Sequence, residues 1–240
     1  ASEIEKEIII ADGKGVQIIA FPELCITGYT CGDLFAQQLL LEEAEMGLIQ
    51  ILNNTRQMDI ISILGMPVAL NGVLLNAAVV IQKGRVLGVV PKTYLPNYKE
   101  FYEKRWFTSA CDVAENSVRL CGQIIPMGRD LLFETADTTF GVEICEDLWA
   151  PIPPSSTLAL QGAEILFNLS ADNEGIGKQE VMESGVLRSA YYQLKEVERN
   201  GKKLNRYLIF KIGKDSMGTL IYIEGLLSEK EMMDMLYKSE

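Results

Sequence analysis

The stretch of sequence that decides the fold is residues 140–149, which read FGVEICEDLW. Apolar and β-branched residues lead up to Cys145 and polar residues follow it, the pattern of a buried strand that ends in a turn. A reactive side chain at such a strand end lies at the edge of a sheet where layered α/β proteins commonly build their active sites. The alternative interpretation is a buried, inert thiol, which is the more usual fate of a free cysteine.

The same arrangement occurs twice more along the sequence. Glu23 follows the apolar run 16–21 and a proline. Lys92 follows the apolar run 85–90 and a second proline. Taken singly, each residue has a plain alternative, a loop carboxylate and a solvated lysine. Together with Cys145 they supply the base, the cation and the nucleophile that acyl transfer requires.

Composition removes several classes of function. The 240 residues contain no histidine, so neither Ser-His-Asp nor Cys-His catalysis is available within them. The five cysteines include no Cys-x-x-Cys pair, so we expect no metal site and the reduced thiols of a cytoplasmic protein. The net charge of -11 disfavours binding to nucleic acid, and no run reaches the ~18 apolar residues of a membrane span.

Hydrophobic periodicity predicts alternating helices and strands. The predicted helices cover residues 1–14, 33–53, 155–162 and 178–200, and a last one begins at Ser228. The predicted strands cover residues 16–21, 59–64, 73–82, 85–90, 131–134, 139–144, 163–169, 207–212 and 219–224. Because hairpins interrupt the alternation, the pattern favours one α/β domain over residues 1–240 with mixed rather than purely parallel sheets.

Longer strings around these residues resemble the nitrilase, or carbon-nitrogen hydrolase, superfamily. The resemblance is closest to the glutaminase domain of bacterial glutamine-dependent NAD synthetases, and it covers about residues 1–178. The strings that carry it are FPELCITGY (21–29), GDLF (32–35), PKTYLPNY (91–98), FYEKRWF (101–107), GVEICEDLW (141–149), NLSA (168–171) and IGK (176–178). The resemblance implies an α-β-β-α sandwich fold.

The resemblance also implies a division of labour at the site. Glu23 would be the general base that activates Cys145. Cys145 would attack the side-chain amide of L-glutamine, form a glutamyl thioester and release ammonia. Lys92 would stabilise the tetrahedral intermediate, helped by the backbone N–H of Glu146. The hydrolysis would need no metal and no cofactor.

Three further residues match supporting positions of the family. Glu103 resembles the family's second glutamate, and Tyr98 and Ser170 match positions that contact the substrate. Each has an alternative interpretation. Glu103 could pair with a neighbouring basic residue at the surface, Tyr98 could be a half-buried aromatic residue, and Ser170 could cap the segment that follows it.

The sequence departs from the family in three places. We expect the strand that usually precedes the first helix to be missing, and residues 179–240 diverge from the family pattern. The Ser-Gly-Gly-x-Asp-Ser loop of the synthetase half does not occur in these residues, so ATP and Mg would belong to a separate synthetase domain.

The resemblance therefore implies a glutaminase that supplies ammonia to an NAD synthetase domain, its partner, and that assembles as a homo-oligomer. Two alternatives stay open. One is a stand-alone amidase of the same superfamily that acts on another small amide. The other is a catalytically inactive scaffold domain, against which the intact Glu23, Lys92 and Cys145 set argues.

Overall fold

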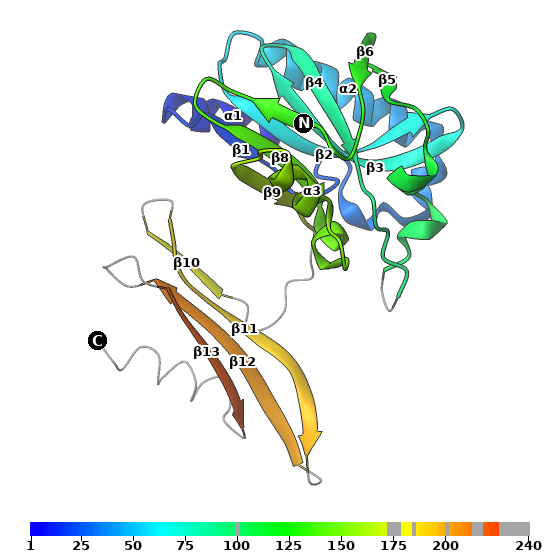
Figure 1. Ribbon diagram of the computed structural model, residues 1–240. Helices are drawn as coiled ribbons and strands as arrows, with labels where there is room; N and C mark the ends of the chain where they lie inside the picture. Colours follow the sequence, from blue (N-terminus) through cyan, green and yellow to red (C-terminus); the bar gives the residue numbers. More distant parts are fainter. Residues whose placement is uncertain (99–100, 172–178, 184–185, 200–201, 213–217, 226–240) are drawn as a thin grey trace. The chain divides into compact units, whose positions relative to one another are not determined.

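The computed structural model describes residues 1–98, 101–171, 179–183, 186–199, 202–212 and 218–225 (Figure 1). The chain divides into two compact units, Ala1–Ala171 and Asp172–Glu240. The single domain expected over residues 1–240 stays a prediction. Two of the segments singled out in the sequence, residues 176–178 and the helix expected from Ser228, lie outside the described residues.

The first unit begins with two helices and a four-stranded sheet of order β1-β2-β3-β4 (Figure 1). These elements are α1 (Ser2–Gly13), β1 (Ile18–Ala20), α2 (Gln38–Asn54), β2 (Ile61–Leu70), β3 (Val73–Gln82) and β4 (Arg85–Pro91). Strand β1 is parallel to β2, and the other neighbours are antiparallel. The predicted hairpin of β3 and β4 is confirmed, and its two turn residues, Lys83 and Gly84, both have positive φ, as a type I′ turn requires.

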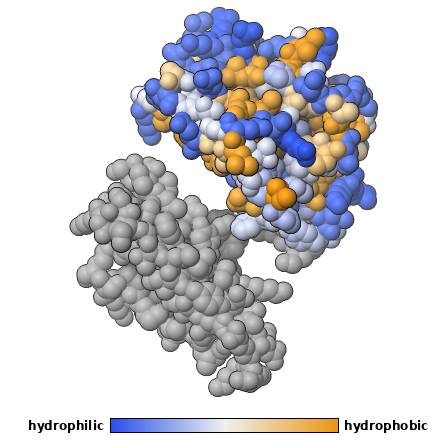
Figure 2. All heavy atoms as spheres, viewed as in Figure 1, coloured by the Kyte–Doolittle hydropathy of each residue, from blue (hydrophilic) through white to orange (hydrophobic). Residues whose placement is uncertain are grey.

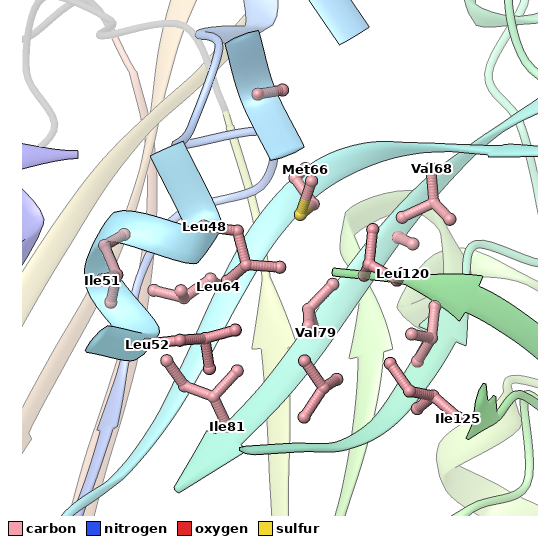
Figure 3. Packing of buried hydrophobic residues seen from close by; sticks show 14 of the residues in the cluster. Leu48, Ile51, Leu52, Leu64, Met66, Val68, Val79, Ile81, Leu120 and Ile125 are labelled. Carbon is pink, nitrogen blue, oxygen red and sulfur yellow. The ribbon is translucent and has the colours of Figure 1, made fainter. Parts of the chain in front are cut away.

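Both faces of this sheet are covered, which explains why β2 is almost wholly apolar and buried. On one face, side chains of α2 pack against alternate residues of β2 and β3 (Figure 3). The contacting residues include Leu48, Ile51, Leu52, Leu64, Met66, Val79 and Ile81. On the opposite face, Ile63, Val80 and Val90 pack against Phe140 and Val142 of a second sheet.

The second sheet has the order β7-β8-β9. Its strands are β7 (Leu132–Glu134), β8 (Thr139–Ile144) and β9 (Ile165–Leu169), and α3 (Pro154–Leu160) covers its outer face. A Cβ atom added at Gly141 would lie 2.8 Å from a methyl group of Leu158, which is fully buried. Glycine in the middle of β8 therefore lets α3 approach the sheet. The layers follow the order α-β-β-α, so the predicted sandwich with mixed sheets is confirmed.

Short 3-10 helices and a small hairpin complete the first unit. They are η1 (Tyr29–Ala36), η2 (Glu103–Arg105), η3 (Ala110–Asp112), η4 (Cys145–Trp149), β5 (Ser117–Leu120) and β6 (Gln123–Pro126). The helix predicted over residues 33–53 is interrupted, because Gln37 is extended (φ -87°, ψ 121°) and separates η1 from α2. On the coloured part of the surface in Figure 2, apolar patches lie among hydrophilic ones. Leu160 is 91% exposed.

The helix predicted over residues 178–200 is wrong. This segment forms β10 (Gln179–Glu183) and β11 (Val186–Arg199), which continue into β12 (Lys202–Ile212) and β13 (Gly218–Gly225). The four strands form one antiparallel sheet in chain order. Strand β11 pairs with β12 along most of its length, and such pairing overrides a local helix propensity, which is only a weak preference. The two late strands predicted near residues 207 and 219 are confirmed.

Candidate active site

The three residues predicted from strand ends follow β1, β4 and β8, and two of them are in direct contact. Lys92 Nζ lies 2.7 Å from Glu23 Oε1, and both side chains are fully buried. Cys145 lies close enough to Glu23 and Lys92 for both charges to act on the pKa of its thiol. The strand ends therefore gather a carboxylate, a cation and a thiol at one edge of the sandwich.

Lys92 bridges two carboxylates. Its ammonium donates to Glu23 Oε1 and to Glu103 Oε1, each at 2.7 Å, and Glu103 is 1% exposed. Burial by itself would lower the pKa of Lys92, but the two carboxylates together outweigh it and raise that pKa. Lys92 is therefore held as a cation. The alternative of a surface ion pair for Glu103 is excluded by its burial.

The segment that carries Glu103 is fixed by polar contacts at its two ends. Tyr29 donates its hydroxyl proton to Glu103 Oε1 at 2.8 Å. Arg105 donates two hydrogen bonds to Asp33, at 2.6 and 3.0 Å, and Trp106 donates its indole N–H to Asp33 at 2.9 Å. Burial raises the pKa of Glu103, although Lys92 acts in the opposite direction. This segment thus places a carboxylate of raised proton affinity against the lysine.

The loop that carries Glu23 lies directly on strand β2. Leu24 has a positive φ of 52°, an unusual conformation for a residue with a branched side chain. A Cβ atom at Gly65 of β2 would lie 2.6 Å from the carbonyl oxygen of Pro22 and closer still to the backbone N of Leu24. Only glycine at position 65 leaves room for the loop, so the position of Glu23 depends on it.

The turn that presents the nucleophile is strained and tied to the lysine segment. Cys145 has a positive φ of 45°. The buried carboxylate of Asp147 accepts hydrogen bonds from the backbone N–H groups of Ile144 (3.1 Å), Thr93 (3.0 Å) and Tyr94 (2.7 Å). Burial raises the pKa of Asp147 to about 6 despite these donors. One carboxylate therefore joins the cysteine turn to the residues that follow Lys92.

The thiol of Cys145 favours its protonated form. Burial raises its pKa, and the negative charge of Glu23 adds to the rise. Ser170, whose hydroxyl donates to Sγ at 3.2 Å, and the charge of Lys92 act in the opposite direction but do not cancel it. A thiol in this state becomes a nucleophile only when a neighbouring base removes its proton.

The two expected substrate contacts lie in different places. Ser170 is at the sulfur of Cys145, at the end of β9. Tyr98 is half exposed and donates its hydroxyl proton to the Glu146 carboxylate at 2.8 Å, which raises the pKa of Tyr98 to about 12. Contact of either residue with a substrate, and the role of the Glu146 N–H, stay predictions.

Two residues of the site were missed in the sequence. Asn76 of β3 is 1% exposed and donates to Glu23 Oε1 at 2.7 Å. Glu143, two residues before the nucleophile, accepts from Asn168, which also donates to the carbonyl oxygen of Cys145. The only available signal was the presence of a polar residue in an otherwise apolar strand.

Comparison with known families decides where this fold belongs. The model of the carbon-nitrogen hydrolase family matches residues 2–194. The chain belongs to the carbon-nitrogen hydrolase family. A second model, a family of unknown function (DUF6108), matches residues 159–236 and overlaps the end of the first match.

Relatives of this carbon-nitrogen hydrolase domain include much longer proteins. The glutamine-dependent NAD(+) synthetase of Mycobacterium tuberculosis (strain ATCC 25618 / H37Rv) is 40% identical over 169 residues, which are 69% of this chain and 25% of that protein. The rat enzyme of the same name is 30% identical over 231 residues, 92% of this chain and 30% of its own length. The chain thus spans about a quarter of the length of its mycobacterial relatives.

Solved structures agree with this placement. A glutamine-dependent NAD(+) synthetase from Cytophaga hutchinsonii has a TM-score of 0.60 and 26% identity, covering 98% of this chain and 43% of that one. An amidase of the nitrilase superfamily from Nesterenkonia AN1 has a TM-score of 0.54 and 17% identity, covering 99% of this chain and 90% of the amidase. The second likeness shows the fold alone.

The part of the chain that the structure describes contains no helix long and apolar enough to cross a membrane. Within the same part, no three His, Cys, Asp or Glu side chains gather as metal ligands would.

Proposed function

We propose that this carbon-nitrogen hydrolase domain hydrolyses the side-chain amide of L-glutamine through a cysteine thioester. The observation that carries the proposal is the buried contact of Lys92 with Glu23 and Glu103 beside the thiol of Cys145. With no histidine in the sequence, this cluster offers the base that the protonated thiol requires.

In the first half of the reaction, Glu23 takes the proton of Cys145 as Sγ attacks the amide carbon. The carbonyl oxygen becomes an oxyanion, which the ammonium of Lys92 and the backbone N–H of Glu146 stabilise. Glu23 then returns the proton to the amide nitrogen, the C–N bond breaks, and ammonia leaves. The product on the enzyme is a glutamyl thioester.

In the second half, water replaces ammonia. Glu23 accepts a proton from the water as its oxygen attacks the thioester carbon, and Lys92 again stabilises the oxyanion. The C–S bond breaks, glutamate leaves, and Sγ regains the proton. Neither half requires a cofactor or a metal.

We propose further that the ammonia passes to an NAD synthetase domain outside this sequence, which would hold ATP and Mg. The support is that the mycobacterial and rat relatives are named glutamine-dependent NAD(+) synthetases and are three to four times longer than their matched parts. In this proposal the domain works in the cytoplasm as a homo-oligomer, with Tyr98 and Ser170 contacting the glutamine.

A stand-alone amidase is the second candidate. It is favoured by the Nesterenkonia amidase, which this chain matches over 90% of that protein's length. Its substrate would be a small amide without the amino-acid group of glutamine.

The test is ammonia release from L-glutamine by the purified chain, beside the Cys145→Ala variant and beside acetamide and propionamide as substrates. Release from glutamine that disappears in Cys145→Ala supports the proposal. Faster release from acetamide or propionamide favours the second candidate. If none of the three substrates reacts, even after a synthetase domain is added, the proposal is wrong and the alternative of an inactive scaffold domain is favoured.

A further inference from the structure

Asn76 is the one polar side chain of strand β3 that contacts the carboxylates of the catalytic cluster. Its neighbours Leu75 and Ala77 belong to the apolar cluster under the helices, whereas Ala78 packs toward the second sheet. Because side chains alternate along a strand, Asn76 shares the inner face with Ala78. The backbone carbonyl of Asn76 also accepts from the N–H of Lys92 at 2.8 Å, which fixes the strand against the lysine.

The amide of Asn76 is oriented by the two carboxylates. Its Nδ2 donates to Glu23 Oε1 at 2.7 Å and faces Glu103 Oε2 at 3.4 Å. An inverted amide would place Oδ1 against two carboxylates, which can only accept hydrogen bonds when ionised. In the observed orientation Oδ1 is buried and has no partner among the described residues. An unsatisfied buried carbonyl is unfavourable, so the favourable contribution of Asn76 comes from the hydrogen bonds that its N–H groups donate.

The two carboxylate oxygens of Glu23 accept unequal numbers of hydrogen bonds. Oε1 accepts from Lys92 Nζ and from Asn76 Nδ2, both at 2.7 Å. Oε2 accepts from one donor among the described residues, the backbone N–H of Ala171, at 3.1 Å. Each carboxylate oxygen has two lone-pair sites, so Oε1 is filled and Oε2 keeps one open.

We propose that Asn76 is a positioning residue that, together with Lys92, occupies Oε1 of Glu23, so that Oε2 is the atom that receives the proton of Cys145. The inference rests on the proposed function, because it assigns an atom to the base of that mechanism. Asn76 acts through Glu23 and touches no substrate. Without its N–H groups the ionised form of Glu23 loses a donor, and the proton is no longer directed to one oxygen.

The test compares the parent chain with Asn76→Leu, which removes the donors and keeps the bulk. Two rates are followed against pH: glutamine hydrolysis, and alkylation of Cys145 by iodoacetamide, located by peptide mapping. We expect kcat to fall about 10-fold with KM changed less than about twofold, since positioning a base affects the chemical step. The acid limb of both profiles should move up by about one pH unit, the size of one lost hydrogen bond to a charged group.

Thr55→Val is the matched control. The Thr55 side chain is buried like that of Asn76, but its hydroxyl donates to the carbonyl oxygen of Ile51 in α2 rather than to a group of the cluster. Its removal should leave both profiles unchanged. A folded Asn76→Leu whose profiles overlay the parent's overturns the inference. A raised KM with unchanged kcat overturns it as well, because Asn76 would then contact the substrate.

Asn76→Asp covers the case in which Asn76→Leu does not fold. A protonated carboxyl still donates one O–H, whereas an ionised one adds a third negative charge. The activity of Asn76→Asp should therefore fall as pH rises, where the parent's increases, and a profile parallel to the parent's would refute the assignment. The alkylation profile needs no glutamine. If the parent releases no ammonia, the proposed function fails while this profile still decides the role of Asn76.

Discussion

Two groups of ion pairs in the first unit have similar nitrogen–oxygen distances and opposite surroundings. Lys92 lies 2.7 Å from both Glu23 and Glu103, and the three side chains are at most 2% exposed. Arg105 lies 2.6 Å from Asp33, with side chains that are 64% and 69% exposed. Water and salt screen the second pair but not the first, so burial rather than distance sets what each pair does. The charges of the buried group therefore act on one another at nearly full strength, whereas the exposed pair contributes little beyond fixing a segment.

The largest expected effect is on turnover in Glu23→Gln. Glutamine keeps the shape and its oxygen can still accept from Lys92, but it cannot take a proton. General bases contribute about 10²–10⁴-fold, so we expect glutamine hydrolysis to fall by about 10³-fold or more. Ammonia release and circular dichroism measure activity and fold side by side. Activity retained in a folded variant would show that the base is another residue.

The next largest effect is on stability in Lys92→Met. Removing the cation leaves Glu23 and Glu103 facing each other in a buried site, and loss of one partner from a buried ion pair costs about 3–5 kcal/mol. Urea unfolding measures this loss of free energy. Lys104→Met is the matched control, because Lys104 is exposed and its loss should change stability little. Equal stability of the two variants would show that the buried lysine contributes no more to stability than the exposed one.

A third test concerns a buried carboxylate whose direct partners are backbone N–H groups. Burial raises the pKa of Asp147 to about 6 from an ordinary value of 3.8, so the folded state binds its proton more tightly than the unfolded state. The resulting stability is fully present below pH 3.8 and is lost as pH rises through about 6. The parent should therefore lose on the order of 2–3 kcal/mol relative to Asp147→Asn across this window.

Urea unfolding at pH 4, 5, 6 and 7 measures the difference, with the exposed Asp137→Asn as control. A difference between the parent and Asp147→Asn that stays constant with pH would contradict a raised pKa at Asp147.

The smallest effect is expected at the exposed pair. Asp33→Asn removes the charge that Arg105 meets in solvent, while Glu103 keeps its contacts with Lys92 and Tyr29. Ammonia release should stay within about twofold of the parent, and the urea midpoint should be unchanged, because screened surface pairs contribute little. Asparagine keeps an oxygen that can accept from Arg105 and Trp106, so loss of activity as large as in Glu23→Gln would mean that the charge of Asp33 is needed to hold the Glu103 segment.

The strand-end pattern predicts three members of the cluster from the sequence alone, whereas Glu103 is predicted only by the family resemblance. Glu23, Lys92 and Cys145 each follow an apolar run, and that local signal survives in the sequence. Asn76 could not be found in the same way. Its partner Glu23 is 53 positions away, and one asparagine in an apolar strand has no meaning until the sheet brings the two together.

The fold, too, was predictable where the signal lies in neighbouring residues and not where it depends on distant ones. The hairpin of β3 and β4 was predictable, because its turn needs only neighbouring residues. The error over residues 178–200 arose because local patterning cannot weigh the partners that β11 finds in β12. The small hairpin of β5 and β6 was missed because its turn residue Cys121 has a positive φ that cysteine rarely adopts.

The protonated state of Cys145 has a consequence for how fast its sulfur is oxidised. Thiolates, rather than thiols, are the forms that peroxide converts to sulfenic acid. Because burial and Glu23 keep the sulfur protonated at rest, oxidation should be slow in the interval between turnovers. The same surroundings that make a base necessary in the proposed mechanism thus protect the sulfur from oxidation between turnovers.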